Sequence, residues 1–112
     1  MFLAIIHVFL HKAFEYYSLS AEQDYPEAQT SLGFFYNQGL GTEQDYEKAF
    51  QLFQRSAEQG FPVTMFAYGD CYYLGNGVKQ DLKKAAEWYQ KALDAGYESD
   101  QTDQEHLAEV LG

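Results

Sequence analysis

The stretch LGFFYNQGLG at residues 32–41 decides the fold, because it recurs in altered form as YGDCYYLGNG at residues 68–77. A shift of 36 residues aligns residues 25–60 with residues 61–96 without a gap, and eleven of the paired positions are identical. Unrelated windows of this length share only about two or three identities. The repeat predicts an array of similar units, each of which buries its apolar face against a neighbour.

The same 36-residue frame extends towards the N-terminus. KAF at residues 12–14 matches KAF at residues 48–50, and SAEQ at residues 20–23 matches SAEQ at residues 56–59. The frame fails before residue 11, where no pair of glycines is present. We therefore divide the chain into an N-terminal helix that is half a repeat with an atypical start (1–25), two full units (26–61 and 62–97) and an acidic C-terminal capping helix (98–112).

Each full unit carries the signals of two helices. Pro26 suits the first turn of a helix, where its missing N–H has no partner to lose, and Gly39 can end that helix in a left-handed conformation. Asp45 can cap a second helix, which we expect to end near Gly60. The second unit repeats these signals at Pro62, Gly75, Asp81 and Gly96. No alternating strand pattern is present, so we predict an all-α chain of about six helices, with terminal capping helices included.

Shared apolar positions predict how the two helices of a unit pack. On the first helix, Ala28, Leu32 and Tyr36 recur every four residues and form one stripe. The small residue beside this stripe, Gly33, lets a neighbouring helix come close. The matching stripe of the second helix consists of Ala49, Leu52, Phe53, Ser56 and Ala57, and in the second unit of Ala85, Trp88, Tyr89, Ala92 and Leu93.

These positions resemble the Sel-one-like repeat family, which is related to the tetratricopeptide repeats. The family pattern is Ala-x3-Leu-Gly-x2-Tyr-x2-Gly-x-Gly-Val-x2-Asp, followed by Lys-Ala, an aromatic pair, Ala and Gly. The first unit matches it at Ala28, Leu32, Gly33, Tyr36, Gly39, Gly41, Asp45, Lys48, Ala49, Phe53, Ala57 and Gly60. The second matches at Gly69, Tyr72, Gly75, Gly77, Val78, Asp81, Lys84, Ala85, Trp88, Tyr89, Ala92 and Gly96. The units depart from it at Thr42, Leu52, Thr64 and Tyr68.

The resemblance covers residues 12–97 and implies a right-handed α-solenoid that acts as a scaffold or adaptor in assembling protein complexes. Some secreted relatives tie each helix pair with a disulfide and have been linked to β-lactam binding. This chain has a single cysteine, Cys71, so we do not extend that property to it. In the tail, residues 102–105 read as a capping box that starts a short helix closing the last repeat.

The charge balance excludes several classes of partner. The chain has seventeen acidic and seven basic residues, and its net charge is −10. Nucleic acids and anionic membrane surfaces both attract lysine and arginine, so we expect neither as a partner. The run from Asp94 to Glu109 holds six acids and no lysine or arginine. We favour a solvated face for this run, and the alternative is a surface for a basic partner.

No motif for catalysis or for a cofactor is present. Gly39-x-Gly41 and its repeat, Gly75-x-Gly77, lack the preceding strand and the third glycine of a dinucleotide site, so we interpret them as turns. Acidic residues are plentiful, but no pattern sets a pair of them in an apolar pocket. We predict that the chain is not an enzyme and uses no cofactor.

Two other residue types could carry chemistry. His7 and His11 share a helical face, but no third ligand stands nearby in the sequence, so we favour ordinary histidines over a metal site. Cys71 lies beside Tyr72 and Tyr73 within a predicted helix, a setting typical of a buried thiol rather than a nucleophile.

The first ten residues, Met1 to Leu10, are mostly apolar. They are too few for a membrane-spanning helix, which takes about 20 apolar residues. A secretory signal needs a basic start, whereas Lys12 follows this run, and no cleavage site is evident. We predict a buried or capping helix in a cytoplasmic protein, and a degenerate export signal with a secreted or periplasmic location is the alternative. The single cysteine is compatible with a reducing compartment.

A candidate binding face lies opposite the consensus stripe of the first helix. At about 100° per residue, positions 30, 34 and 37 point away from that stripe, and so do their counterparts one repeat later. These residues are Thr30, Phe34, Asn37, Phe66, Asp70 and Tyr73. First helices line the concave surface of tetratricopeptide-like solenoids, so we predict that this face binds a peptide or an amphipathic helix. The alternative is that these side chains pack between adjacent first helices.

The sequence therefore predicts a protein-interaction module whose partner is another protein of unknown identity. The alternative is a structural or regulatory fragment of a longer solenoid with no ligand of its own. Further 36-residue periods upstream would favour that alternative.

Overall fold

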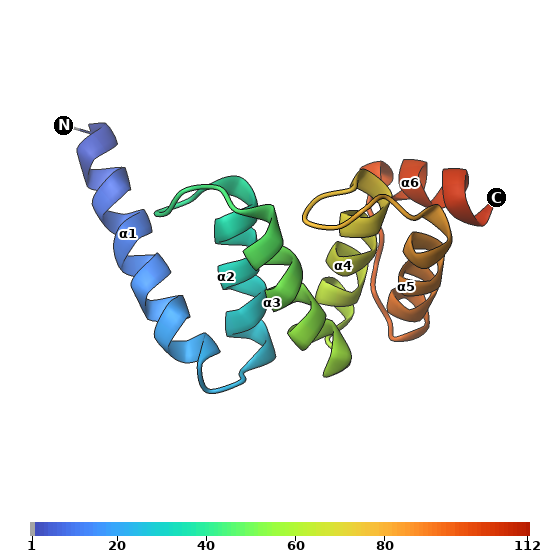
Figure 1. Cartoon of the computed structure of the whole chain (residues 1–112), viewed down its shortest axis with the longest axis horizontal. Helices are drawn as coiled ribbons and strands as arrows, with labels where there is room; N and C mark the ends of the chain where they lie inside the picture. The colour runs from blue at the N-terminus through green and yellow to red at the C-terminus, as the bar shows by residue number, and fades with distance from the viewer. Residues whose placement is uncertain (1) are drawn as a thin grey trace.

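The computed structural model describes residues 2–112, which form six α-helices and no strand (Figure 1). The helices are α1 (Phe2–Ala21), α2 (Pro26–Gln38), α3 (Tyr46–Glu58), α4 (Pro62–Leu74), α5 (Leu82–Asp94) and α6 (Gln101–Leu111). They follow one another along a molecule that measures 47 × 29 × 25 Å, with the two termini at opposite ends. This stack is the predicted α-solenoid.

The helix ends follow the predicted local signals. Pro26 opens α2, and Gly39 ends it with a left-handed backbone at φ 70°. The backbone N–H of Lys48 donates a hydrogen bond to the carboxylate of Asp45 (3.1 Å), which caps α3. The second unit repeats the proline, the left-handed glycine and the aspartate cap at Pro62, Gly75 and Asp81.

The Gly-x-Gly segments are turns, and each one contacts the helix that precedes its own unit. A Cβ on Gly41 would overlap the carbonyl group of Leu10 on α1, and a Cβ on Gly77 would overlap that of Tyr46 on α3. The second glycine of each turn is therefore required by the close approach of two backbones. Through this contact each unit is placed against the helix before it.

Within each unit, a glycine lets two helices close around an aromatic ring. An ideal Cβ on Gly33 would lie 2.5 Å from Cε1 of Phe53, and one on Gly69 would lie 2.7 Å from Cδ1 of Tyr89. Both rings are fully buried, as is most of the predicted stripe on α3 and α5. Two members of that stripe, Trp88 and Leu93, lie at its edge and are only half-buried.

A cluster of three hydroxyl groups lies at the joint between the two full units. Ser56 Oγ on α3 is 2.9 Å from Thr30 Oγ1 on α2 and 3.0 Å from Thr64 Oγ1 on α4. Thr30 also donates to the carbonyl of Pro26 (2.7 Å), and all three side chains are buried. The cluster therefore ties α2, α3 and α4 together by hydrogen bonds rather than by apolar contact alone.

The last helix starts earlier than the sequence indicated. Its capping box pairs Asp100 with Asp103: the N–H of Asp103 donates to Asp100 (2.8 Å), and the N–H of Asp100 donates to Asp103 (3.0 Å). The predicted box at residues 102–105 was wrong, because it required Glu or Gln at the third helical position, and aspartate fills that role here. The hydroxyl of Tyr97 also donates to Asp103 (2.7 Å) and fixes this start.

The N-terminal stretch is helical but not buried, so of the two predicted alternatives, a buried or a capping helix, the buried one was wrong; Met1 lies outside the described residues. Phe2, Phe9 and several other apolar side chains of α1 are exposed. No helix within residues 2–112 combines the length and apolar character that crossing a membrane requires.

Candidate functional site

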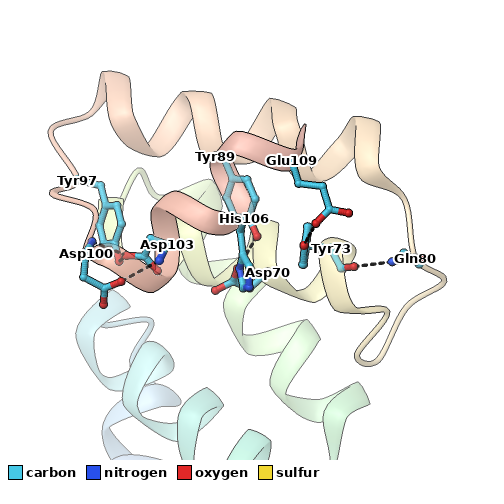
Figure 2. Close-up of polar contacts among 9 residues, drawn as sticks. All are labelled: Asp70, Tyr73, Gln80, Tyr89, Tyr97, Asp100, Asp103, His106 and Glu109. Carbon is cyan, nitrogen blue, oxygen red and sulfur yellow. Dashed lines mark hydrogen bonds and ion pairs between the residues drawn. The ribbon is translucent and has the colours of Figure 1, made fainter. Parts of the chain in front are cut away.

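Residues one repeat apart face each other across successive first helices. Asp70 on α4 and His106 on α6 are 36 residues apart, and Asp70 Oδ1 lies 3.0 Å from His106 Nδ1 (Figure 2). Tyr73 and Glu109 are also 36 residues apart, and the tyrosine hydroxyl donates to that carboxylate. α6 therefore occupies the place of a first helix in a third unit.

This frame defines two sets of positions, which we call the first-helix rows: Phe34, Asp70 and His106 in one, and Asn37, Tyr73 and Glu109 in the other. Four of the six predicted site residues belong to the rows, and these four are half-buried. Sequence reasoning missed His106 and Glu109, which the 36-residue shift aligns with Asp70 and Tyr73 but which differ from them in residue type.

Two predicted site residues do not lie on an accessible face. Thr30 is buried in the hydroxyl cluster, where its hydroxyl group contacts that of Thr64 in the next unit. The ring of Phe66 is 2% exposed and stacks on Tyr89 and on Tyr97, with ring centroids 4.4 and 4.5 Å away. Their prediction as contact residues was wrong, because the next helices along the chain cover this side. For Thr30 and Phe66, packing between neighbouring helices is what the structure shows.

Asp70 accepts contacts from two other helices. Tyr89 donates its hydroxyl hydrogen to Asp70, and His106 contacts the same carboxylate oxygen (Figure 2). Burial raises the pKa of Asp70 above its ordinary value, while the hydrogen bonds with Tyr89 and His106 oppose that rise. Burial and the adjacent carboxyl group also raise the pKa of Tyr89. Tyr89 therefore stays protonated and remains a hydrogen-bond donor.

Tyr73 on α4 contacts both of the row residues that lie on α6. Its ring stacks on the imidazole of His106, with centroids 4.3 Å apart and planes 23° from parallel. Its hydroxyl reaches Glu109, and this hydrogen bond raises the pKa of Tyr73. Aromatic rings and carboxylates therefore lie side by side where α4 meets α6.

Comparison with protein families assigns the chain. A model of the Sel1 repeat matches residues 10–25, 26–61 and 62–97. The chain belongs to the Sel1 repeat family. The resemblance drawn from the sequence is thereby confirmed. No curated protein matches this Sel1 chain.

Three solved structures show the same fold. A protective antigen of uropathogenic Escherichia coli strains that displays an SLR fold is 36% identical to the Sel1 chain, with a TM-score of 0.76 over 78% of it and 19% of the antigen. A Sel1 repeat protein from Oxalobacter formigenes is 34% identical, with a TM-score of 0.77 over 79% of this chain and 25% of that one. Cysteine rich protein B of Helicobacter pylori is 28% identical, with a TM-score of 0.71 over 76% and 64%. The Sel1 chain thus spans between 19% and 64% of these proteins.

The remaining candidate groups do not form a reactive site. Cys71 is buried, and burial raises the pKa of its thiol to about 12. His11 pairs with Glu15 on the surface of α1 (2.9 Å) and lines a shallow hollow with His7 beside the Gly41 turn. Within residues 2–112, no three His, Cys, Asp or Glu side chains gather as a metal site would require. Sel1 repeat proteins are typically scaffolds without enzymatic activity.

Proposed function

We propose that this chain is a scaffold or adaptor that binds a segment of a partner protein along the two first-helix rows. Sel1 repeats generally serve as protein–protein interaction modules, and this proposal places the contact on α2, α4 and α6. The observation that supports it is the alignment of Asp70 with His106 and of Tyr73 with Glu109. Equivalent positions of successive units thus lie side by side where α4 meets α6.

The chemistry of the rows favours a particular partner. Phe34 and Tyr73 place half-buried rings in the rows, and the rows also hold two carboxylates, those of the half-buried Asp70 and the exposed Glu109. Rings provide a large contact area at a low cost in side-chain entropy, and acidic neighbours attract lysine and arginine. The net charge of −10 adds a long-range attraction for the same residues. A segment with a basic side chain between apolar ones fits this surface best.

A second candidate is a purely structural segment of a solenoid with no ligand of its own. The short share of the E. coli and O. formigenes proteins that the chain spans favours this candidate. It differs from the interaction module in one testable respect, since it requires no specific contact on the rows.

Site-specific photocrosslinking in cells that express the chain distinguishes the two candidates. A photoreactive phenylalanine analogue replaces Asn37 in one row, and in a matched control it replaces Lys83, which is exposed on α5. We expect a partner captured from position 37 and absent from position 83, with unchanged helical circular dichroism in both proteins. The same products from both positions, or none from either, would overturn the interaction module and favour the structural segment.

A further inference from the structure

One side of α1 is apolar and uncovered. Phe2, Phe9 and Tyr16 follow one another at seven-residue intervals, and their exposed fractions are 76%, 72% and 66%. At this spacing the three rings lie along one side of the helix. Ile5, Val8 and Leu19, also exposed, flank them. Large contiguous apolar patches on a protein surface mark interaction sites.

On α3 and α5, the side that corresponds to the uncovered side of α1 packs against another helix. Leu52 on α3 is 9% exposed because α2 packs against it, whereas Tyr16, one repeat earlier, is 66% exposed. Ser56 is completely buried, but its counterpart Ser20 is only half-buried. The side of α1 that carries Tyr16 and Ser20 is therefore built to receive a helix.

We propose that a second copy of this chain covers this side, through an antiparallel pair of α1 helices related by a two-fold axis. The three rings lie beside three smaller residues, Ile6, Ala13 and Ser20, which are also seven residues apart. An antiparallel pair centred on residue 11 sets each ring of one copy against a smaller residue of the other. Phe2 then meets Ser20, Phe9 meets Ala13, and Tyr16 meets Ile6, so the surface is complementary to itself.

A hollow at the end of this side accommodates the incoming ring. It has a volume of about 390 Å³, lies between α1 and α2, and is lined by Tyr16, Ser20 and Ala28 among others. Phe2 of the second copy would enter it. A second hollow of about 320 Å³, lined only by Ala4, Ile5, Val8 and Phe9, extends the apolar surface towards the N-terminus.

The area and charge of α1 suit such a dimer. Three rings that each expose about seven-tenths of roughly 200 Å² supply about half of the ~800 Å² that each partner buries in a standard interface. The flanking aliphatic side chains contribute further area. Lys12 and Glu15 are the only lysine, arginine or acidic residues of α1, so two such helices meet without net repulsion. The acidic α6 lies at the other end of the long axis.

The α6 helix of a second copy cannot fill the same place. The position that faces the ring in each full unit is glycine, at Gly33 and Gly69, because even a Cβ would collide there. In α6 the equivalent position is Glu105. A head-to-tail chain of molecules through α6 and α1 would place the charged side chain of Glu105 at this position, which disfavours it by size and by charge.

Sedimentation equilibrium of the full chain over about 1–100 μM tests the dimer, because the proposal requires association within this range of concentration. The parent should reach twice its mass of 12.9 kDa. Phe9→Glu should weaken dimerisation at least about 100-fold, because it places two charges in an apolar contact. Leu82→Glu on α5, where the leucine is also exposed, should leave it unchanged. A parent that stays monomeric at 100 μM, or equal effects of both variants, would overturn the proposal.

Cysteine crosslinking tests the orientation of the helices in a Cys71→Ala background. A mixture of Phe9→Cys and Ala13→Cys chains should form the mixed disulfide in preference to either homodimer, with Val63→Cys as a control for random collision. Preferential pairing of position 9 with position 9 would contradict the antiparallel register. These readouts change no residue of the first-helix rows, so they stand or fall separately from the proposed binding to the rows.

Discussion

Asp70 of α4 and His106 of α6 hold the same position in consecutive repeats, and their side chains meet at 3.0 Å across the joint. This contact shows that α6 continues the solenoid although its sequence has lost the repeat pattern. None of the residues of α6 is fully buried, so polar contacts such as this one add to the packing of Leu107 and Val110 against the core. The surface proposed to bind a partner therefore depends on the protonation and geometry of Asp70.

The stability of the protein should depend on pH through Asp70. Burial raises the pKa of Asp70 in the folded state, so the folded protein holds this proton more tightly than the unfolded chain does. The protonated Asp70 stabilises the fold fully when the pH is below the ordinary pKa of aspartate in an unfolded chain. This stabilisation is lost as the pH rises through the raised pKa of the folded state. The side chain of Asp70→Asn does not titrate, so this variant does not lose stability in the same way, and its amide oxygen can still accept a hydrogen bond from Tyr89.

Thermal unfolding at several pH values checks this expectation. The melting temperature of Asp70→Asn relative to the parent should rise as the pH increases from the acidic range towards neutrality. The other titratable groups around Asp70 are the same in both proteins; they are Cys71, Tyr73, Tyr89, Tyr97, Asp103 and His106. A difference that is constant with pH, or that falls, would contradict the account.

The glycine that faces Phe53 should tolerate no side chain. Alanine favours a helix over glycine by about 1 kcal/mol, so Gly33→Ala would stabilise an open position. Here the added Cβ lies 2.5 Å from the ring, and overpacking of about 1–3 kcal/mol should prevail. Urea unfolding measures the net loss, and a Phe53→Leu background should reduce it. An equal loss in both backgrounds would show that the contact is not the cause.

The hydroxyl cluster should behave as a unit. Thr64→Val removes one member and leaves Thr30 and Ser56 with fewer partners, which should cost about 1–3 kcal/mol of unfolding free energy. The triple replacement of Thr30 by Val, Ser56 by Ala and Thr64 by Val should cost clearly less than the sum of the three single changes. Strict additivity in chemical denaturation would argue against coupling.

Cys71 should be unreactive in the folded protein. The thiol is 3% exposed, and its pKa of about 12 leaves almost no thiolate near neutral pH. Modification by a disulfide reagent at pH 8 should be at least about 100-fold slower than in the urea-unfolded chain. A fast reaction under native conditions would mean that α4 opens readily.

Local signals were enough to predict most of the helices. Pro26, Gly39 and Asp45 each act within a few residues of their position, so the sequence alone placed α2 and the start of α3. The accessibility of Thr30 and Phe66 could not be predicted in this way. A helical wheel treats one helix in isolation, whereas these two residues are covered by side chains of later helices.

The role of α6 was hidden for a different reason. Its consensus positions hold Gln104, Glu105 and Ala108, so no stripe of the earlier type is visible. The positions that do continue the frame, His106 and Glu109, differ in chemistry from Asp70 and Tyr73, and only the structure shows that they pair. Residues that pair between repeats differ in type, so a comparison of the sequence with itself, which finds identical residues, does not detect them.

The binding of a captured partner segment to two variants of one residue tests the central claim most directly. Asn37→Arg adds a positive charge to the rows, and Asn37→Asp adds a negative one. We predict that the arginine variant binds at least about 10-fold more weakly, a change of ~1.4 kcal/mol, and that the aspartate variant binds as tightly as the parent or more tightly. Equal affinity of all three proteins in calorimetry, or tighter binding by the arginine variant, would contradict the account.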